Sequence, residues 1–184
     1  MPHPGLVAHY QHLLGVAQYL DVALSWTVVQ PLGDLMDIED IVERLRGPDF
    51  ELREVDLEEA GLLVDESGPS IMFLDHVGGI ISQFDTALLE RLSTEARLWH
   101  LTWNVNGHSH LLYGADGRIR LWMPGLDPND AHGPDSHALD HLLPPSHARL
   151  SHAAAMALID QDSGAHLDLE WLNSVQREVS FGAD

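Results

Sequence analysis

The sequence contains no cysteine and no lysine. Without cysteine, the chain can form no disulfide, no thiolate metal site and no thiol nucleophile. Without lysine, it has no amine for a Schiff base and no lysine for a phosphate-binding loop. All nine basic residues are therefore arginines, and the 29 Asp and Glu residues give a formal net charge of −20 at pH 7. Carboxylates, histidines and an acidic surface remain as the available chemistry.

Sequence motifs for nucleotide binding and hydrolysis are also missing, since GxGxxG, GxxxxGK[ST], GxSxG and HExxH do not occur. No apolar run approaches the ~18 residues of a membrane-spanning helix, and the N-terminus lacks the basic start of a secretory signal. We therefore expect a cytoplasmic protein with no membrane partner. Whether it catalyses a reaction stays open, although a non-enzymatic role is favoured. A chain of 184 residues with 45% hydrophobic content predicts a single domain, residues 1–184, with one core.

Acidic residues are concentrated in residues 34–66, which we call the acidic segment. It contains thirteen Asp and Glu residues but only three arginines. Such a surface repels nucleic acid and attracts basic partners. Two interpretations stay open: a solvated face that keeps the protein soluble, or a docking surface for a basic protein. The residues that we predict for a docking surface are Asp34, Asp37, Glu39, Asp40, Glu43, Glu58 and Glu59.

Hydrophobic spacing predicts a mixture of helices and strands. Helices are expected at residues 6–19, 37–47, 84–92, 135–143 and 147–160, with a last helical turn at 170–175. Strands are expected at residues 23–30, 70–76, 98–105, 108–113 and 118–123, with shorter ones at 50–53 and 62–64. The hairpin dipeptides Asn106-Gly107 and Asp116-Gly117 make residues 97–123 a central meander. The fold class is therefore α+β: one domain with a mostly antiparallel sheet and helices packed on one face.

Two histidines on an expected helix form the first candidate metal site. His137 and His141 are four residues apart, which places both imidazoles on one helical face, where they can bind zinc or nickel. A third ligand would come from His132, His147 or Asp135. The alternative interpretation is a polar helix face without metal. Apart from this ion, no cofactor is predicted.

A second candidate pair lies on the expected meander. His108 and His110 are two residues apart, so both point to the same side of a strand. A two-residue turn at Asn106-Gly107 pairs His110 with Trp103, and it turns His100 to the opposite face. A three-histidine site fails in that register, and a shift by one residue would restore it. A polar hairpin end is the alternative.

Two further groups of residues stand out. Asp75 and His76 end an expected strand beside Gly78-Gly79, where open backbone can face a ligand, although a structural strand end is the competing interpretation. The tryptophans at positions 26, 99 and 103 are expected in the core, and those at 122 and 171 in the core or in an interface.

Several short motifs follow one another along the chain. They are Ser25-Trp26-Thr27-Val28-Val29, Trp103-Asn104-Val105-Asn106, Tyr113-Gly114-Ala115-Asp116-Gly117 and His166-Leu167-Asp168-Leu169-Glu170. In this order they resemble a family of uncharacterised actinobacterial domains common in Streptomyces, with the Asn-Val-Asn hairpin as its most distinctive element. The chain departs from that family at Val77-Gly78-Gly79-Ile80, where relatives often carry Glu-Asn-Gly. The resemblance implies one compact domain and carries over no activity and no catalytic residue.

Three functional hypotheses follow. The first is a non-enzymatic protein-interaction domain for a basic protein partner, for example as an immunity protein or inhibitor against a basic toxin or nuclease. The second is an enzyme that depends on histidine or a metal. The third is a regulatory module that binds a small molecule between the sheet and the loop at residues 124–135. The oligomeric state stays open, with a homodimer among the possibilities.

Overall fold

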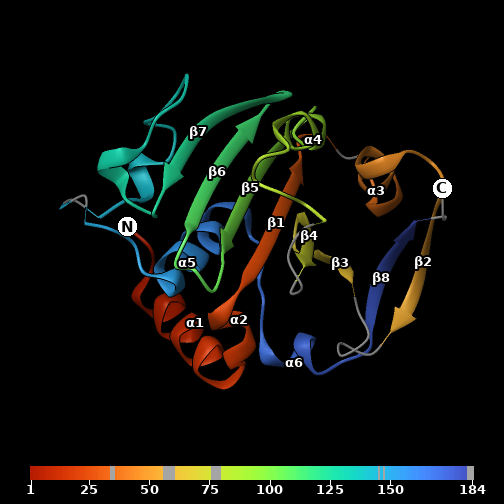
Figure 1. Ribbon diagram of the computed structural model, residues 1–184, viewed down its shortest axis with the longest axis horizontal. Helices are drawn as coiled ribbons and strands as arrows, with labels where there is room; N and C mark the ends of the chain where they lie inside the picture. Colours follow the sequence, from red (N-terminus) through yellow and green to blue (C-terminus); the bar gives the residue numbers. More distant parts are fainter. Residues whose placement is uncertain (34–35, 56–60, 76–79, 145, 147, 182–184) are drawn as a thin grey trace.

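The computed structural model describes residues 1–33, 36–55, 61–75, 80–144, 146 and 148–181. Within them, eight strands form one antiparallel sheet in the spatial order β2-β8-β3-β4-β1-β5-β6-β7 (Figure 1). The strands are β1 (Leu24–Pro31), β2 (Phe50–Val55), β3 (Leu62–Ser67), β4 (Ser70–Asp75), β5 (Ala96–Trp103), β6 (Ser109–Ala115), β7 (Arg118–Pro124) and β8 (Gln176–Phe181). The predicted α+β class and the meander at β5-β6-β7 are confirmed.

Strand β8 is the element that the sequence did not indicate. It lies between β2 and β3, so the last strand of the described chain joins β2 to the rest of the sheet. Its sequence, QREVSF, begins with three polar residues and so lacks the alternation typical of a strand. It follows a four-residue helix, α6 (Leu169–Leu172), where a longer helical turn was expected.

Helices cover both faces of the sheet, whereas the sequence predicted helices on one face. One face, which we call the α1 face, packs against α1 (Pro4–Val16), α2 (Gln18–Val22), α5 (His152–Ser163) and α6. The opposite face, the α3 face, packs against α3 (Ile38–Arg46) and α4 (Thr86–Leu92). Each face carries its own buried apolar cluster, so the sheet is the middle layer of three.

The strands themselves explain why two helical layers are needed. Neighbouring residues of the inner strands are apolar and buried on opposite sides: Leu62 belongs to the α3 face and Leu63 to the α1 face. All six residues of β4 are buried. A strand with no polar alternation must be covered on both faces, as parallel strands in α/β proteins usually are. The continuous apolar runs therefore pointed to two helical layers.

The expected helix at residues 135–143 is replaced by turns and a short 3-10 helix, Asp140–Leu142. The preceding segment follows the edge of β7 instead. Trp122 and His132 exchange backbone hydrogen bonds of 2.8 and 2.9 Å, and Asp135 N donates to Arg120 O at 2.9 Å. These bonds fix the backbone in an extended path before a helix can begin. The next helix, α5, starts only at His152, after the Ser151 cap.

The β5–β6 hairpin differs by one residue from the expected register. Asn104 N donates to His108 O at 3.1 Å, which closes a loop of three residues, 105–107, where a two-residue turn was expected. Gly107 takes the left-handed conformation that such a loop requires, with φ +76°. The shift pairs Thr102 with His110, so His100 and His110 lie on the same face of the sheet.

Candidate functional site

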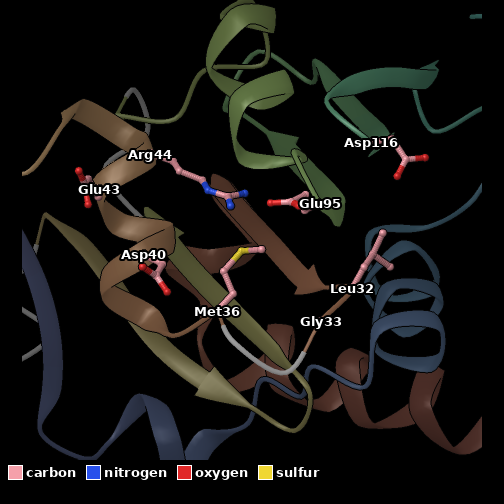
Figure 2. Close-up of a pocket in the computed structure, with 8 residues that line it drawn as sticks. All are labelled: Leu32, Gly33, Met36, Asp40, Glu43, Arg44, Glu95 and Asp116. Carbon is pink, nitrogen blue, oxygen red and sulfur yellow. The ribbon is translucent and has the colours of Figure 1, made fainter.

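An acidic pocket opens on the α3 face, beyond the end of β1. Its volume is about 870 Å³, and its walls come from the β1–α3 connection, α3, the turn before β5 and the β6–β7 turn (Figure 2). The lining residues are Leu32, Gly33, Met36, Asp40, Glu43, Arg44, Glu95 and Asp116. Four carboxylates from three distant parts of the sequence therefore line one pocket.

Helix α3 positions the first two carboxylates. Asp37 caps the helix: its side chain accepts from Asp40 N at 3.0 Å, and Asp37 N donates to the Asp40 carboxylate at 3.1 Å. This reciprocal capping box satisfies two backbone donors at the helix start. The buried stripe of the helix, which includes Ile41 and Leu45, holds it on the sheet. Asp40 is thus fixed at the N-terminus of α3, and Glu43 lies one turn further, exposed to solvent.

Two tight turns position the other two carboxylates. Glu95 and Asp116 both have left-handed backbone, with φ +52° and +53°. Hydrogen bonds tie the turns together, since Leu32 N donates to Glu95 O at 3.0 Å and Gly117 N donates to Ser93 O at 3.0 Å. Among the described residues, only Leu126 shares this conformation without being glycine. At Asp116 this conformation is what the two-residue Asp-Gly hairpin turn requires. At Glu95 it carries a conformational cost of order 1 kcal/mol or more.

Among the described residues that line the pocket, Arg44 is the single arginine, and its guanidinium is already engaged. Its Nη1 donates to the carbonyl oxygen of Thr94. Figure 2 shows Arg44 and Glu95 pointing into the same space between α3 and the start of β5. Asp116 forms an exposed ion pair with Arg120 at 3.5 Å, which solvent screens. The electrostatic balance inside the pocket is therefore negative and favours a cation.

The predicted docking residues divide into four groups. Asp40 and Glu43 line the pocket, Asp37 caps α3, and Glu39 lies exposed on the same helix without lining the pocket. Asp34, Glu58 and Glu59 lie outside the described residues. The sequence analysis missed Glu95 and Asp116. The Asp116-Gly117 turn was recognised, but only the folded chain brings it beside α3.

The first pair of candidate metal ligands does not lie on one helical face, because that helix does not form. The two histidines contact different carboxylates: His137 Nδ1 lies 2.8 Å from an Asp140 oxygen, and His141 Nε2 lies 3.7 Å from an Asp162 oxygen. The backbone of His132 forms hydrogen bonds with Trp122 of β7. His147 lies outside the described residues.

The second pair is also arranged differently from the expectation. His108 precedes β6 and lies exposed in the hairpin loop. Trp122 Nε1 donates to His110 Nδ1 at 3.2 Å, which leaves the proton of a neutral His110 on Nε2. Partial burial, followed by the charge of His108, lowers the pKa of His110. Across the described part of the chain, no three metal-ligating side chains form a group. A zinc or nickel site remains an untested prediction.

A row of polar side chains crosses the α3 face at one end of the sheet. The members of this polar row, from β4 to β6, are Asp75, Ser25, Thr102 and His110. The backbone of residues 80–81 contacts one end of this polar row. Ile80 N donates to Asp75 Oδ2 at 2.7 Å, and Ser25 Oγ donates to Ile81 O at 3.3 Å. Asp75 therefore has the structural role of a strand end, while His76 lies outside the described residues.

His100 lies beside the polar row and is fully buried. Its Nδ1 lies 2.8 Å from Thr27 Oγ1, while its Nε2 contacts no hydrogen-bonding atom of the described residues. Burial, followed by the nearby His110, lowers the pKa of His100 to about 3. His100 is therefore neutral at physiological pH and belongs to the interior of the α3 face.

Comparisons with known proteins give no relative. No protein-family model matches the sequence, and no curated protein or solved structure is significantly similar to it. The resemblance to actinobacterial domains accordingly remains a prediction. In the described ranges, no helix has both the length and the apolar character that crossing a membrane requires.

Proposed function

We propose that the protein is a non-enzymatic cytoplasmic binding protein whose acidic pocket takes basic side chains of a protein partner. The observation that supports this most directly is the meeting of Asp40, Glu43, Glu95 and Asp116 around one pocket of about 870 Å³. An immunity or inhibitor role against a basic toxin or nuclease is one form of this function.

The size and charge of the pocket favour arginine or lysine side chains over a small ion. The cavity has a volume typical of a ligand site and is wide enough for more than one side chain. Carboxylates recognise a guanidinium through charge-assisted and often bidentate hydrogen bonds. Because the four carboxylates come from three separate segments, α3 and two turns, an entering cation can be contacted from several sides.

The overall charge supports the same partner. A net charge of −20 speeds the encounter with a basic protein and repels acidic ones. Association should therefore be faster at low salt and slower when the ionic strength exceeds about 0.15 M, where the screening length is about 8 Å. A polar pocket of fixed charges adds specificity to this general attraction.

The direct test compares two triple variants that each remove three negative charges. The pocket variant is Glu43→Gln/Glu95→Gln/Asp116→Asn, and the surface control is Glu39→Gln/Glu66→Gln/Glu170→Gln. Asn suits the left-handed backbone at position 116 as well as Asp does. The probe is a labelled oligo-arginine peptide, and binding is measured by fluorescence anisotropy at low and at physiological salt. We expect the pocket variant to bind about tenfold more weakly or worse, and the control to stay within about twofold.

The same proteins then serve as baits in a host lysate, with captured proteins identified by mass spectrometry. A basic partner retained by the wild type and the control, but lost by the pocket variant, is the expected result. Equal weakening by both triple variants would show that bulk charge, and no particular pocket, attracts the peptide, and the proposal would fail.

A further inference from the structure

The two edges of the sheet differ in whether further backbone covers them. The outer edge of β7 is covered, because Trp122, His132, Arg120 and Asp135 exchange backbone hydrogen bonds along it. The outer edge of β2 pairs with no strand among the described residues, and Figure 1 shows β2 as the outermost strand on its side of the molecule. An unpaired edge presents a row of backbone donors and acceptors that a further strand can extend.

The side chains of β2 carry charges of mixed sign. Glu51, Arg53 and Glu54 are exposed, while Phe50 and Leu52 are half-buried against the core of the α3 face. Charged residues on an edge commonly prevent pairing with another chain. A strand with acidic, basic and acidic residues prevents such pairing less effectively. It can pair with the same strand of a second copy so that opposite charges face each other.

We infer that two copies of the protein associate through antiparallel pairing of their β2 strands, with Leu52 opposite Leu52 of the second copy. A two-fold axis perpendicular to the sheet must pass through a residue paired with itself, which leaves few registers. In the register centred on Leu52, Glu51 faces Arg53 of the second copy, and the reverse pair repeats the contact. Centring on Glu51, Arg53 or Glu54 would place like charges directly opposite each other, which is destabilising.

The geometry of Arg53 supports this register. Its Nε lies 2.6 Å and its Nη2 2.6 Å from the same oxygen of Glu178, on the neighbouring strand β8. This contact turns the guanidinium towards β8, on the inner side of β2, while 55% of the side chain stays exposed. Nη1 contacts no acceptor among the described residues, so it can donate to a second carboxylate. Glu51 of the second copy would supply it, so that Arg53 bridges two acidic residues across three strands.

This pairing is independent of the acidic pocket, and it is tested on the full chain alone. Sedimentation velocity over a concentration series measures the monomer–dimer equilibrium of wild type, Glu51→Arg and Glu66→Arg. It is carried out at about 0.15 M salt or above, where the repulsion between two copies of net charge −20 is screened. Glu66 is exposed on the inner strand β3, so its variant makes the same charge change away from the edge. We expect Glu51→Arg, which turns two attractive pairs into repulsive ones, to weaken the dimer about tenfold or more. Glu66→Arg should leave it as strong as in the wild type or stronger.

A cysteine variant reports the register directly, because the natural chain contains no cysteine. Leu52→Cys should form an intermolecular disulfide under mild oxidation, since the two residues would lie directly opposite each other. The matched control, Glu54→Cys, should not, because position 54 would face Phe50 of the second copy. Urea denaturation checks that each variant folds. A monomer at every concentration, or equal cross-linking of the two cysteine variants, would overturn the inference.

Discussion

The two faces of the sheet differ in the side chains that they bury. The α1 face is filled with large side chains, and two of them have bonded polar atoms: Trp103 Nε1 donates to Leu20 O at 2.8 Å, and Tyr10 OH donates to Asp160 at 2.8 Å. Trp26 Nε1, also buried on this face, has no hydrogen-bond partner among the described residues. Burial, followed by the charge of Asp160, raises the pKa of Tyr10. The α3 face is covered by helices of nine and seven residues, contains the polar row and His100, and opens into the acidic pocket.

This difference indicates a division of roles between the faces. Large, fully buried aromatic residues contribute most to stability, because each removes a great deal of apolar surface from water. Buried polar groups contribute less net stability and make an interior sensitive to single substitutions. We therefore expect stability to depend mainly on the α1 face, and binding to depend mainly on the α3 face.

The largest predicted effect tests whether stability depends mainly on the α1 face. Trp99 is fully buried on the α1 face, and its Nε1 donates to Asp162 at 3.2 Å. Trp99→Ala should lower the free energy of unfolding by about 3–5 kcal/mol, measured by urea denaturation. At a temperature where the variant is still folded, its affinity for the oligo-arginine peptide should be unchanged. A loss of affinity without unfolding would show that the two faces are not separate in function.

The sequence predicted the fold class and most strands because local patterns determine them. Residues 97–123 have hairpin dipeptides between apolar strands, and such patterns do not depend on distant parts of the chain. The second helical layer could in principle have been predicted from the continuous apolar run of β4, residues 71–74. The pairing of β8 with β2 and β3 was not, because long-range pairing of a short strand leaves no local signal.

The candidate site was predicted only in part, for a related reason. Asp40 and Glu43 stood out through the density of charge around them, whereas Glu95 and Asp116 are single acidic residues in turns. Their convergence depends on the backbone bonds between the two turns and β1. The predicted register of the β5–β6 hairpin was wrong by one residue. The reason is that Asn-Gly suits a three-residue loop with glycine last as well as a two-residue turn.

The second prediction tests the buried polar interior of the α3 face through pH. The folded protein lowers the pKa of His100 from 6.5 to about 3, so the unfolded chain takes up this proton more readily. The contribution of His100 to stability is therefore complete above about pH 6.5 and is lost as the pH falls towards 3. In this window the free energy of unfolding should fall by up to about 1.4 kcal/mol per pH unit from this group. Urea denaturation between about pH 7 and pH 4 measures it.

The matched variant for this measurement is Thr27→Val/His100→Leu, which removes both partners of the buried hydrogen bond. It should be close to wild type in stability at neutral pH and should show a shallower decline on acidification. Thr27→Val alone should cost about 1–3 kcal/mol at neutral pH, because His100 Nδ1 loses its partner. If the double variant declined as steeply as the wild type, carboxylates elsewhere would account for the pH dependence, and His100 would not.

The smallest predicted effect joins stability to binding on the α3 face. Asp37→Ala removes the cap of α3 and should cost about 0.5–2 kcal/mol, a loss that hydrogen exchange would locate in the first turn of the helix. Because that turn carries Asp40, affinity for the oligo-arginine peptide should fall with it. Asp37→Asn keeps the cap but removes the charge, so the two variants separate the structural role of this residue from a direct one. If Asp37→Asn retains both stability and affinity, Asp37 acts by positioning Asp40. If it retains stability but loses affinity, the partner contacts Asp37 itself, and the binding surface extends along α3 beyond the pocket.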